Sequence, residues 1–207
     1  MINILYDCKY FTVCEKPSGL ISELSEKTET SLPALLSKQL GDIPLFTVHR
    51  LDKEVGGIIV YAKSEKIAAA LSAQITDSRF KKEYTATVSG KPTEDSALLC
   101  DLLFHDRAKN KTYVVKRKRQ GVKEARLSYE LLSYDEKTDR SLLKIKLYTG
   151  RTHQIRVQLA SRGFPICGDR KYGSAETVKP MRLFASSLSF VHPVSEEELS
   201  FSITPDW

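Results

Sequence analysis

Residues 49–64 read HRLDKEVGGIIVYAKS and place a polar cluster directly before a continuous apolar run. The run at 56–63, GGIIVYAK, starts with glycines and is rich in β-branched residues, which predicts a strand buried on both faces. His49, Arg50 and Asp52 then lie on a loop in front of that strand. A carboxylate in such a place is held by a rigid scaffold and is still within reach of a substrate.

The segments around this strand mix strands and helices. Alternating apolar residues predict strands at 10–16 and 83–90, and a hairpin joins 125–134 to 141–150 across a polar turn. A helix is predicted after Ser64, because apolar or core-facing residues follow the i, i+3, i+4 rhythm at Ile67, Ala70, Leu71, Gln74 and Ile75. Strands dominate and helices are interspersed irregularly, which predicts an α+β fold.

A second helix is predicted within residues 151–163, RTHQIRVQLASRG. Thr152 is the predicted cap, and Ile155 and Leu159 share one face. Gly163, followed by Pro165, predicts the stop. This short helix carries several cationic and amide side chains, among them Arg156, so it is a candidate part of an active site.

Composition narrows the class of protein. The chain has 207 residues with 41% hydrophobic and 28% charged residues, which is typical of a globular protein with a real core. Lys and Arg outnumber Asp and Glu by 32 to 26, and this basic balance favours a polyanionic partner. No repeat or linker marks a boundary, so one domain over residues 1–207 is expected.

The cysteines and the N-terminal residues point to the cytoplasm. The four cysteines form no CxxC pair and have no zinc-finger spacing to a histidine, so no metal is expected. Asp7 and Lys9 interrupt the start where a signal peptide needs an apolar core, and no later run approaches membrane-spanning length. We expect a cytoplasmic protein without a membrane partner.

Three residues in these segments each have a structural and a chemical interpretation. Asp52 either pins a turn before a glycine pair or works as a catalytic carboxylate. Tyr84 is either a half-buried sheet residue or a stacking platform beside basic residues. Arg156 is either a surface arginine or an active-site cation.

Together these segments resemble the RluA-type pseudouridine synthases of the RluA/RsuA superfamily. The resemblance rests on HRLDKEVGG (49–57), KKEYTATVSG (81–90) and GRTHQIRVQLASRGFPICGDRKYG (150–173), with EKPSGL (15–20) and LFASSLSFVHP (183–193) in support. It implies a pseudouridine synthase fold with a twisted, mainly antiparallel mixed sheet. It also implies an isomerase that converts uridine to pseudouridine in structured rRNA or tRNA without a cofactor.

The resemblance assigns roles to the candidate site residues. Asp52 is implied to be the catalytic nucleophile or base, since the bond from uracil to ribose must break and re-form without release of the base. Arg156 is implied to hold Asp52 ionised and aimed, and Tyr84 to stack on the uracil and serve in proton transfer. Ile155 is implied to form part of the pocket wall.

RNA contacts are expected at further basic residues. Arg50 resembles the family's base-flipping arginine, whose flat head fills the space that the flipped base leaves, while His49 beside it shapes the loop. The remaining expected RNA contacts are Lys81, Lys82, Lys116, Arg117, Lys118, Arg119, Arg151, His153 and Arg170. The basic run at 114–123 reads either as this RNA grip or as a solvated hairpin tip.

Two regions depart from the family pattern. The family continues the aspartate loop with Thr-Ser-Gly, whereas this chain has Val55, Gly56 and Gly57, and Phe184 stands where a histidine is common. The alternative hypotheses are a catalytically impaired RNA-binding protein with the synthase fold and a nucleoside hydrolase. The KPSG turn begins at residue 16, so no N-terminal S4-like RNA-binding domain is expected, and the resemblance implies a monomer without an obligatory protein partner.

Overall fold

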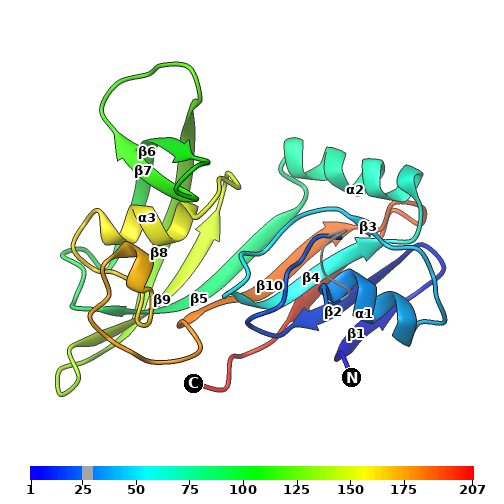
Figure 1. Ribbon diagram of the computed structural model, residues 1–207, viewed down its shortest axis with the longest axis horizontal. Coiled ribbons are helices and arrows are strands. Elements are labelled where there is room, and N and C mark those ends of the chain that lie inside the picture. The colour runs from blue at the N-terminus through cyan, green and yellow to red at the C-terminus, as the bar shows by residue number, and fades with distance from the viewer. Residues whose placement is uncertain (25–29) are drawn as a thin grey trace. The chain divides into compact units, whose positions relative to one another are not determined.

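The computed structural model describes residues 1–24 and 30–207. These residues form two compact units, residues 1–82 with 184–206 and residues 83–183 with 207. Both units combine strands with short helices (Figure 1), and the α+β class predicted from the sequence is confirmed. The single catalytic domain expected over residues 1–207 stays a prediction.

The first unit contains a sheet in the order β1-β2-β4-β10. Its strands are β1 (Ile4–Asp7), β2 (Phe11–Lys16), β3 (Phe46–Thr47), β4 (Gly56–Ala62), β10 (Leu183–Val191) and β11 (Glu198–Ser202). Strand β3 pairs with β4, and β11 pairs with β10. All these pairs are antiparallel except β4 with β10, which run parallel with Phe184 opposite Gly56 and Ala185 opposite Gly57.

Strand β4 is the buried strand predicted from GGIIVYA, and all seven of its residues are buried. It pairs with β2 along one edge, and its other partners are β10 at Gly56 and Gly57, β3 at Tyr61 and Ala62, and the His49 ring at Val60 N. Its apolar side chains join a core with those of β2, β10 and α2. The loop that carries Asp52 therefore leads into the most deeply buried strand of this unit.

The helices of the first unit are α1 (Leu32–Gln39) and α2 (Glu65–Thr76). The predicted cap of α2 is confirmed, since Ser64 Oγ accepts a hydrogen bond from Ile67 N at 3.4 Å. Its Gln74 side chain donates to Val191 O at 2.7 Å and accepts from Val191 N at 2.9 Å, which ties α2 to β10. Helix α1 had no counterpart in the sequence analysis, although Ser31 and Pro33 stand at its start.

The second unit contains a sheet in the order β5-β9-β8-β6-β7. Its elements are β5 (Lys81–Ser89), β6 (Ser96–Asp106), β7 (Lys111–Val115), β8 (Val122–Asp135), β9 (Arg140–Leu147), α3 (Gln154–Ala160) and the 3-10 helix η1 (Arg170–Tyr172). The predicted hairpin is confirmed as the antiparallel pair β8 and β9. Helix α3 contacts β6 and β7, and Val157 packs with Leu103, Ala125 and Tyr172. Within the described ranges, no helix has the length and apolarity needed to cross a lipid bilayer.

The predicted cap of α3 is wrong by one residue. His153, not Thr152, is the N-cap, and it has a left-handed backbone with a φ of 53° and no capping bond from its side chain. Gln154 Oε1 accepts from Arg151 N at 3.0 Å, which ties the first helical residue to the chain before the N-cap. The predicted stop is confirmed, since Gly163 has a φ of 90° and its N donates to Ala160 O at 3.1 Å.

The segment 16–22, KPSGLIS, holds the backbone of the Asp52 loop through four carbonyl contacts. Lys16 Nζ and Gly19 N donate to Lys53 O at 3.0 and 2.8 Å. Ser18 Oγ donates to Glu54 O at 2.7 Å, and Ser22 Oγ donates to Leu51 O at 2.8 Å. We call this set of contacts the 16–22 clamp, and it fixes the residues on both sides of Asp52.

Lys16 is fully buried at the end of β2. Its ammonium group donates to Pro17 O and to Lys53 O, both at 3.0 Å. Burial lowers the pKa of Lys16 to about 8, against the opposing influence of Glu54 and Asp52.

Gly57 is required by its backbone and by its neighbour. Its φ is +117°, and a Cβ there would lie 2.3 Å from Ala185 O on β10. Gly90 also has a positive φ, +82°, but its Cβ position has nothing within 4 Å. Substituting Gly90 therefore adds only backbone strain, whereas substituting Gly57 adds backbone strain and a steric clash.

We expect Gly57→Ala to lower the free energy of unfolding by about 2–4 kcal/mol, because strain and overpacking add. Gly90→Ala serves as the matched control, with a loss of about 1 kcal/mol from conformation alone. Urea unfolding of both variants measures the difference. Equal losses would contradict the clash with β10.

The pKa of Lys16 is about 8 in the folded protein and 10.5 for a free lysine. Between these two pH values, we expect the free energy of unfolding of the wild-type protein to rise relative to that of Lys16→Met. In this window the unfolded chain binds more protons at Lys16 than the folded protein does, so stability increases with pH, by at most about 3 kcal/mol. Urea titrations at pH 7 and pH 10 measure this difference. A difference that does not change with pH would contradict the lowered pKa.

Candidate functional site

Asp52 is half-buried and lies on the loop between β3 and β4. Its carbonyl accepts from Val55 N at 3.0 Å, which closes a turn, and the 16–22 clamp holds Leu51, Lys53 and Glu54 around it. The turn interpretation and the catalytic interpretation are therefore compatible. A backbone this constrained fixes the position from which the carboxylate extends.

Arg50 and His49, beside Asp52, have opposite environments. Arg50 is exposed, and its Nη1 pairs with Glu23 Oε2 at 3.0 Å. His49 is buried, its Nε2 accepts from Val60 N at 3.3 Å, and its ring packs edge-on against Phe80. Burial, aided by the charge of Lys82, holds the pKa of His49 well below its usual value. This environment favours the loop-shaping role of His49 over an RNA contact.

Tyr84 is buried on β5 with 6% of its surface exposed, in the second unit. Nearby on the same strand, Lys81 is exposed and Lys82 is half-buried, with its Nζ 5.8 Å from the centre of the Phe80 ring. Burial lowers the pKa of Lys82. Strand β5 thus carries an exposed lysine, Lys81, and a half-buried lysine, Lys82, ahead of the buried Tyr84.

Arg156 is buried on α3 and forms a bidentate ion pair with Asp169. Its Nε donates to Asp169 Oδ2 at 2.7 Å and its Nη2 donates to Asp169 Oδ1 at 2.8 Å. Its guanidinium carbon lies 5.1 Å from the centre of the Tyr172 ring. Sequence reasoning did not single out Asp169, although this residue lies in the quoted motif GDRKYG directly after the apolar FPIC.

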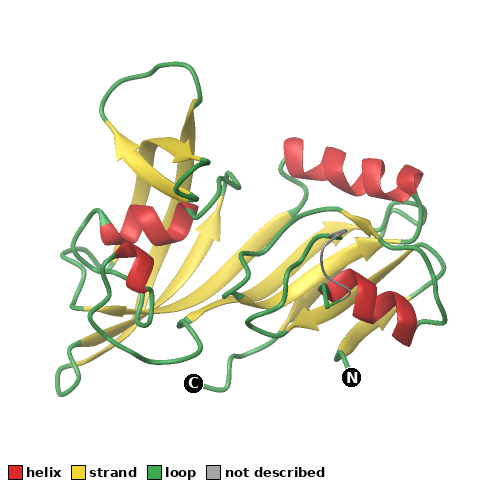
Figure 2. Ribbon diagram, in the orientation of Figure 1, coloured by secondary structure: helices red, strands yellow, loops and turns green. Residues whose placement is uncertain are grey.

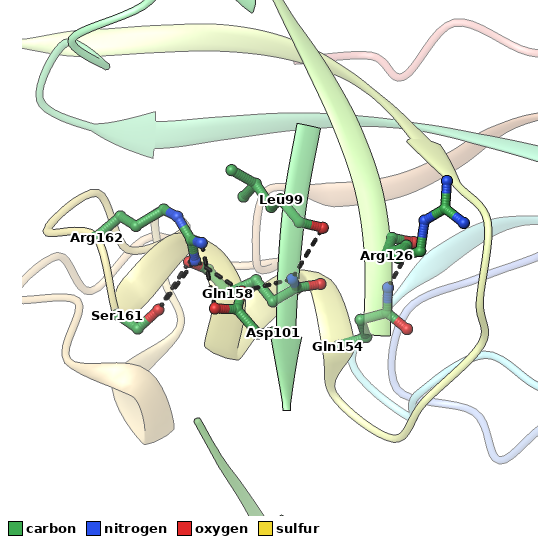
Figure 3. A network of polar contacts seen from close by, with 7 residues as sticks. All are labelled: Leu99, Asp101, Arg126, Gln154, Gln158, Ser161 and Arg162. Atoms are coloured by element: carbon green, nitrogen blue, oxygen red, sulfur yellow. Dashed lines mark hydrogen bonds and ion pairs between the residues drawn. The ribbon is translucent and has the colours of Figure 1, made fainter. Parts of the chain in front are cut away.

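Helix α3 is held to the sheet by amide and ionic contacts, drawn in Figure 3. Gln154 Nε2 donates to Arg126 O on β8 at 3.0 Å, and Gln158 Nε2 donates to Asp101 Oδ2 on β6 at 2.6 Å. Beyond the helix, Arg162 Nη1 also pairs with Asp101 Oδ2, at 2.9 Å. These contacts set the position of the helix, and with it the origin of the Arg156 side chain.

The polar residues at the start of α3 are occupied within the second unit. His153 is buried and its Nδ1 lies 2.9 Å from Tyr172 Oη. Arg151 is half-buried, and its Nε donates to Glu124 O at 2.9 Å. Ile155, the predicted pocket residue, is 4% exposed. The burial of His153 favours a structural role, whereas Arg151 keeps part of its surface open.

The basic run at 116–119 lies in the loop between β7 and β8, which extends beyond the strands in Figure 2. Its four side chains are exposed. Lys118 pairs with the exposed Glu124 at 3.0 Å, and the guanidinium carbon of Arg119 lies 4.8 Å from the centre of the Phe104 ring. Arg170 on η1 is exposed as well. An exposed loop suits either an RNA grip or a solvated hairpin tip.

The structure groups the predicted residues by unit. Asp52, Arg50, His49, Lys81 and Lys82 belong to the first unit, and the other predicted residues belong to the second. The pairing of Asp52 with Arg156 therefore stays a prediction. In the part of the chain that the structure describes, no three His, Cys, Asp or Glu side chains form a group that could hold a metal ion.

Comparisons with known proteins agree with these motifs. The model of the family described as RNA pseudouridylate synthase matches residues 10–161. The chain is 34% identical to an uncharacterized RNA pseudouridine synthase of Aquifex aeolicus, over 98% of this chain and 69% of that protein. It is 32% identical to the dual-specificity RNA pseudouridine synthase RluA of Salmonella typhimurium, over 99% of this chain and 93% of that one.

A solved structure has the same fold. The human RNA pseudouridylate synthase domain containing 1 superposes with a TM-score of 0.81 at 22% identity, and the match covers 100% of this chain and 84% of that chain. The fold, the family match and the relatives agree with the resemblance seen in the sequence. The chain belongs to the RNA pseudouridylate synthase family and is a pseudouridine synthase of the RluA type, an isomerase that acts on RNA.

Proposed function

We propose that this enzyme isomerises specific uridines of structured rRNA or tRNA, with Asp52 as its catalytic nucleophile or base. The observation that carries the proposal is the 16–22 clamp, which fixes the backbone around a half-buried carboxylate. The enzyme acts as one catalytic domain, as a monomer in the cytoplasm, without a cofactor or an obligatory protein partner. The carboxylate supplies the chemistry by attacking the sugar or by removing a proton from it.

Arg156 and Tyr84 complete the proposed catalytic set. The guanidinium of Arg156 pairs with Asp52 and keeps that carboxylate ionised. The ring of Tyr84 stacks on the uracil and its hydroxyl serves in proton transfer at the rejoined carbon. Ile155 adds an apolar wall.

Arg50 is the proposed base-flipping residue. Its Nη1 pairs with Glu23 Oε2 at 3.0 Å, and both side chains of this pair are about half exposed, at 59% and 48%. Such a pair contributes only about 0–1 kcal/mol, so it yields readily to an incoming RNA. The guanidinium then fills the space that the flipped uridine leaves.

Phosphate contacts are proposed at basic side chains that remain open to solvent. Lys81, Arg170 and the loop at 116–119 are exposed, and Lys82 and Arg151 are half-buried. Because each phosphate contact releases bound counterions, RNA affinity falls as salt rises. His49 and His153 act on the shape of the site instead, since both are buried.

The altered aspartate loop is compatible with activity because its two departures from the family pattern meet in space. A Cβ at Gly56 would lie 3.2 Å from Cδ2 of Phe184, so the missing side chain of Gly56 makes room for the larger ring of Phe184. Gly57, which the family pattern shares, keeps the close approach to Ala185. At position 56 the loop has a packing contact with Phe184 in place of the hydroxyl of the family pattern.

Two other functions compete with the proposal. A catalytically impaired RNA-binding protein would keep the fold and its basic surface while making no pseudouridine. A nucleoside hydrolase would release free uracil. Product analysis distinguishes all three, since isomerisation converts uridine without release of the base.

We expect Asp52→Asn to lower pseudouridine formation on the order of a thousandfold or more, because the amide can neither attack the sugar nor accept a proton. The measurement is pseudouridine mapping of total RNA from cells with the gene, without it, and without it but complemented by the variant. A site lost on deletion and not restored by the variant also identifies the RNA.

Glu54→Gln is the matched control, because it removes an exposed carboxylate from the same loop and leaves the backbone contact of Glu54 O in place. This control restores the modified site. Full restoration by Asp52→Asn would remove Asp52 from the reaction. Unchanged RNA in the deletion strain would favour the RNA-binding alternative.

We expect Gly56→Ser, which introduces the hydroxyl of the family pattern, to lower the free energy of unfolding by about 1–3 kcal/mol through its contact with Phe184. Combined with Phe184→His, the loss shrinks by about 0.5–1 kcal/mol, because a smaller ring relieves the contact and accepts a hydrogen bond. Urea unfolding of both single variants and the double variant measures this coupling. Additive losses would contradict it.

A further inference from the structure

Within the second unit, the guanidinium group of Arg156 is hydrogen-bonded along one edge and covered by an aromatic ring on one face. Asp169 Oδ2 and Oδ1 accept from Nε and Nη2, and the Tyr172 ring lies 5.1 Å from the guanidinium carbon. Asp169 is 2% exposed and Arg156 is 6% exposed. A bidentate pair with a stacked ring leaves the guanidinium plane a single orientation.

The position of Asp169 is itself set by a tight turn. Asp169 N donates to Ile166 O at 2.9 Å, and Asp169 O accepts from Tyr172 N and Ser174 N, both at 3.1 Å. The preceding Gly168 has a φ of +84°, and a Cβ there would lie 2.6 Å from Val178 O. The carboxylate is therefore fixed by its own backbone as well as by Arg156.

Tyr172 connects this turn to the start of α3. Its hydroxyl accepts from Thr112 N on β7 at 2.7 Å and lies 2.9 Å from His153 Nδ1. His153 immediately precedes the helix and has a left-handed backbone. The ring beneath Arg156 is thus held at its far end by a strand and by the helix N-cap.

We propose that Asp169 is a positioning residue of the synthase reaction, which orients Arg156 toward its role beside the catalytic carboxylate. This inference rests on the proposed function of Asp52 and Arg156. Because Asp169 holds the Nε and Nη2 edge, the direction in which Nη1 presents its hydrogens is set before RNA binds. Asp169 also neutralises a buried cation that is costly to leave without a carboxylate.

A purely structural role would make Asp169 one more tether of α3, and the chain provides a matched control for that role. Asp101 accepts from Arg162 Nη1 at 2.9 Å and from Nη2 at 3.2 Å, just beyond the C-terminal end of the helix that carries Arg156 (Figure 3). Asp101 also accepts from Gln158 of that helix at 2.6 Å. Asp101→Asn therefore weakens an arginine pair that secures α3 without touching Arg156.

The test is the rate of pseudouridine formation in RNA extracted from cells that lack the gene, with purified wild-type protein and variants. We expect Asp169→Asn to lower kcat about a hundredfold with KM changed less than about threefold, since a misdirected group costs rate rather than RNA affinity. Asp101→Asn stays within about threefold of wild type in both constants. Asp169→Glu, which keeps the charge, recovers part of the lost kcat.

A double variant separates action through Arg156 from action elsewhere. Arg156→Met removes the group to be positioned, so adding Asp169→Asn lowers kcat by no more than about twofold further. A further loss of tenfold or more would overturn the proposal, as would an equal kcat for Asp169→Asn and Asp101→Asn. Thermal unfolding checks that each variant is folded. If Asp169→Asn does not fold, Asp169→Glu decides, and a wild-type kcat for it overturns the proposal.

The same experiment includes wild-type protein and Asp52→Asn. If the wild-type protein makes no pseudouridine, the proposed function fails. If wild type is active and Asp52→Asn is not, but Asp169→Asn matches wild type, the positioning inference alone fails.

Discussion

The Asp52 loop depends on the buried ammonium group of Lys16. This group lies at the end of β2 and donates to the carbonyls of Pro17 and Lys53, so it joins the KPSG turn to the loop that carries the candidate catalytic carboxylate. Moving a cation from water into the protein interior costs free energy, and this desolvation lowers the pKa of Lys16. The carbonyl contacts and the nearby carboxylates offset it. The same group therefore shapes the loop through its backbone contacts.

The two units place a buried cation in two different ways. Lys16 is held by carbonyl dipoles, so its charge is only partly compensated and its pKa falls. Arg156 is held by the full charge of Asp169 and by the Tyr172 ring, and a guanidinium stays protonated in proteins. A point charge with mobile donors suits the fixing of a backbone. A planar, permanently charged group suits bidentate pairing with a carboxylate.

The departures from the family pattern are explained by packing. In the sequence, the glycines of the aspartate loop and Phe184 are separated by well over a hundred positions, and each alone suggests lost polar contacts. In the structure, Phe184 on β10 is the partner of Gly56 on β4, and the ring occupies the space that a side chain at 56 would need. A change at one position thus accounts for the change at the other. This packing contact argues against the hypothesis that the altered loop marks a catalytically impaired protein.

The sequence by itself determined the elements whose patterns are local. The buried strand β4, the cap of α2, the hairpin of β8 with β9 and the glycine stop of α3 follow from periodicity and turn chemistry within a few residues. The motifs also led to the family, which the comparisons confirmed. Helix α1 was missed, because a short helix with few core residues has a weak periodic signal.

Only the tertiary structure decided which polar groups meet. The N-cap of α3 is His153, which has a left-handed backbone and makes no capping bond, so residue type did not reveal it. His49 and His153 lie buried, although Arg50 beside His49 is exposed. Asp169 meets Arg156 across a turn, and Lys16 meets Lys53 across two strands. Such contacts depend on where the chain returns after folding, and no local pattern of residue types encodes that return.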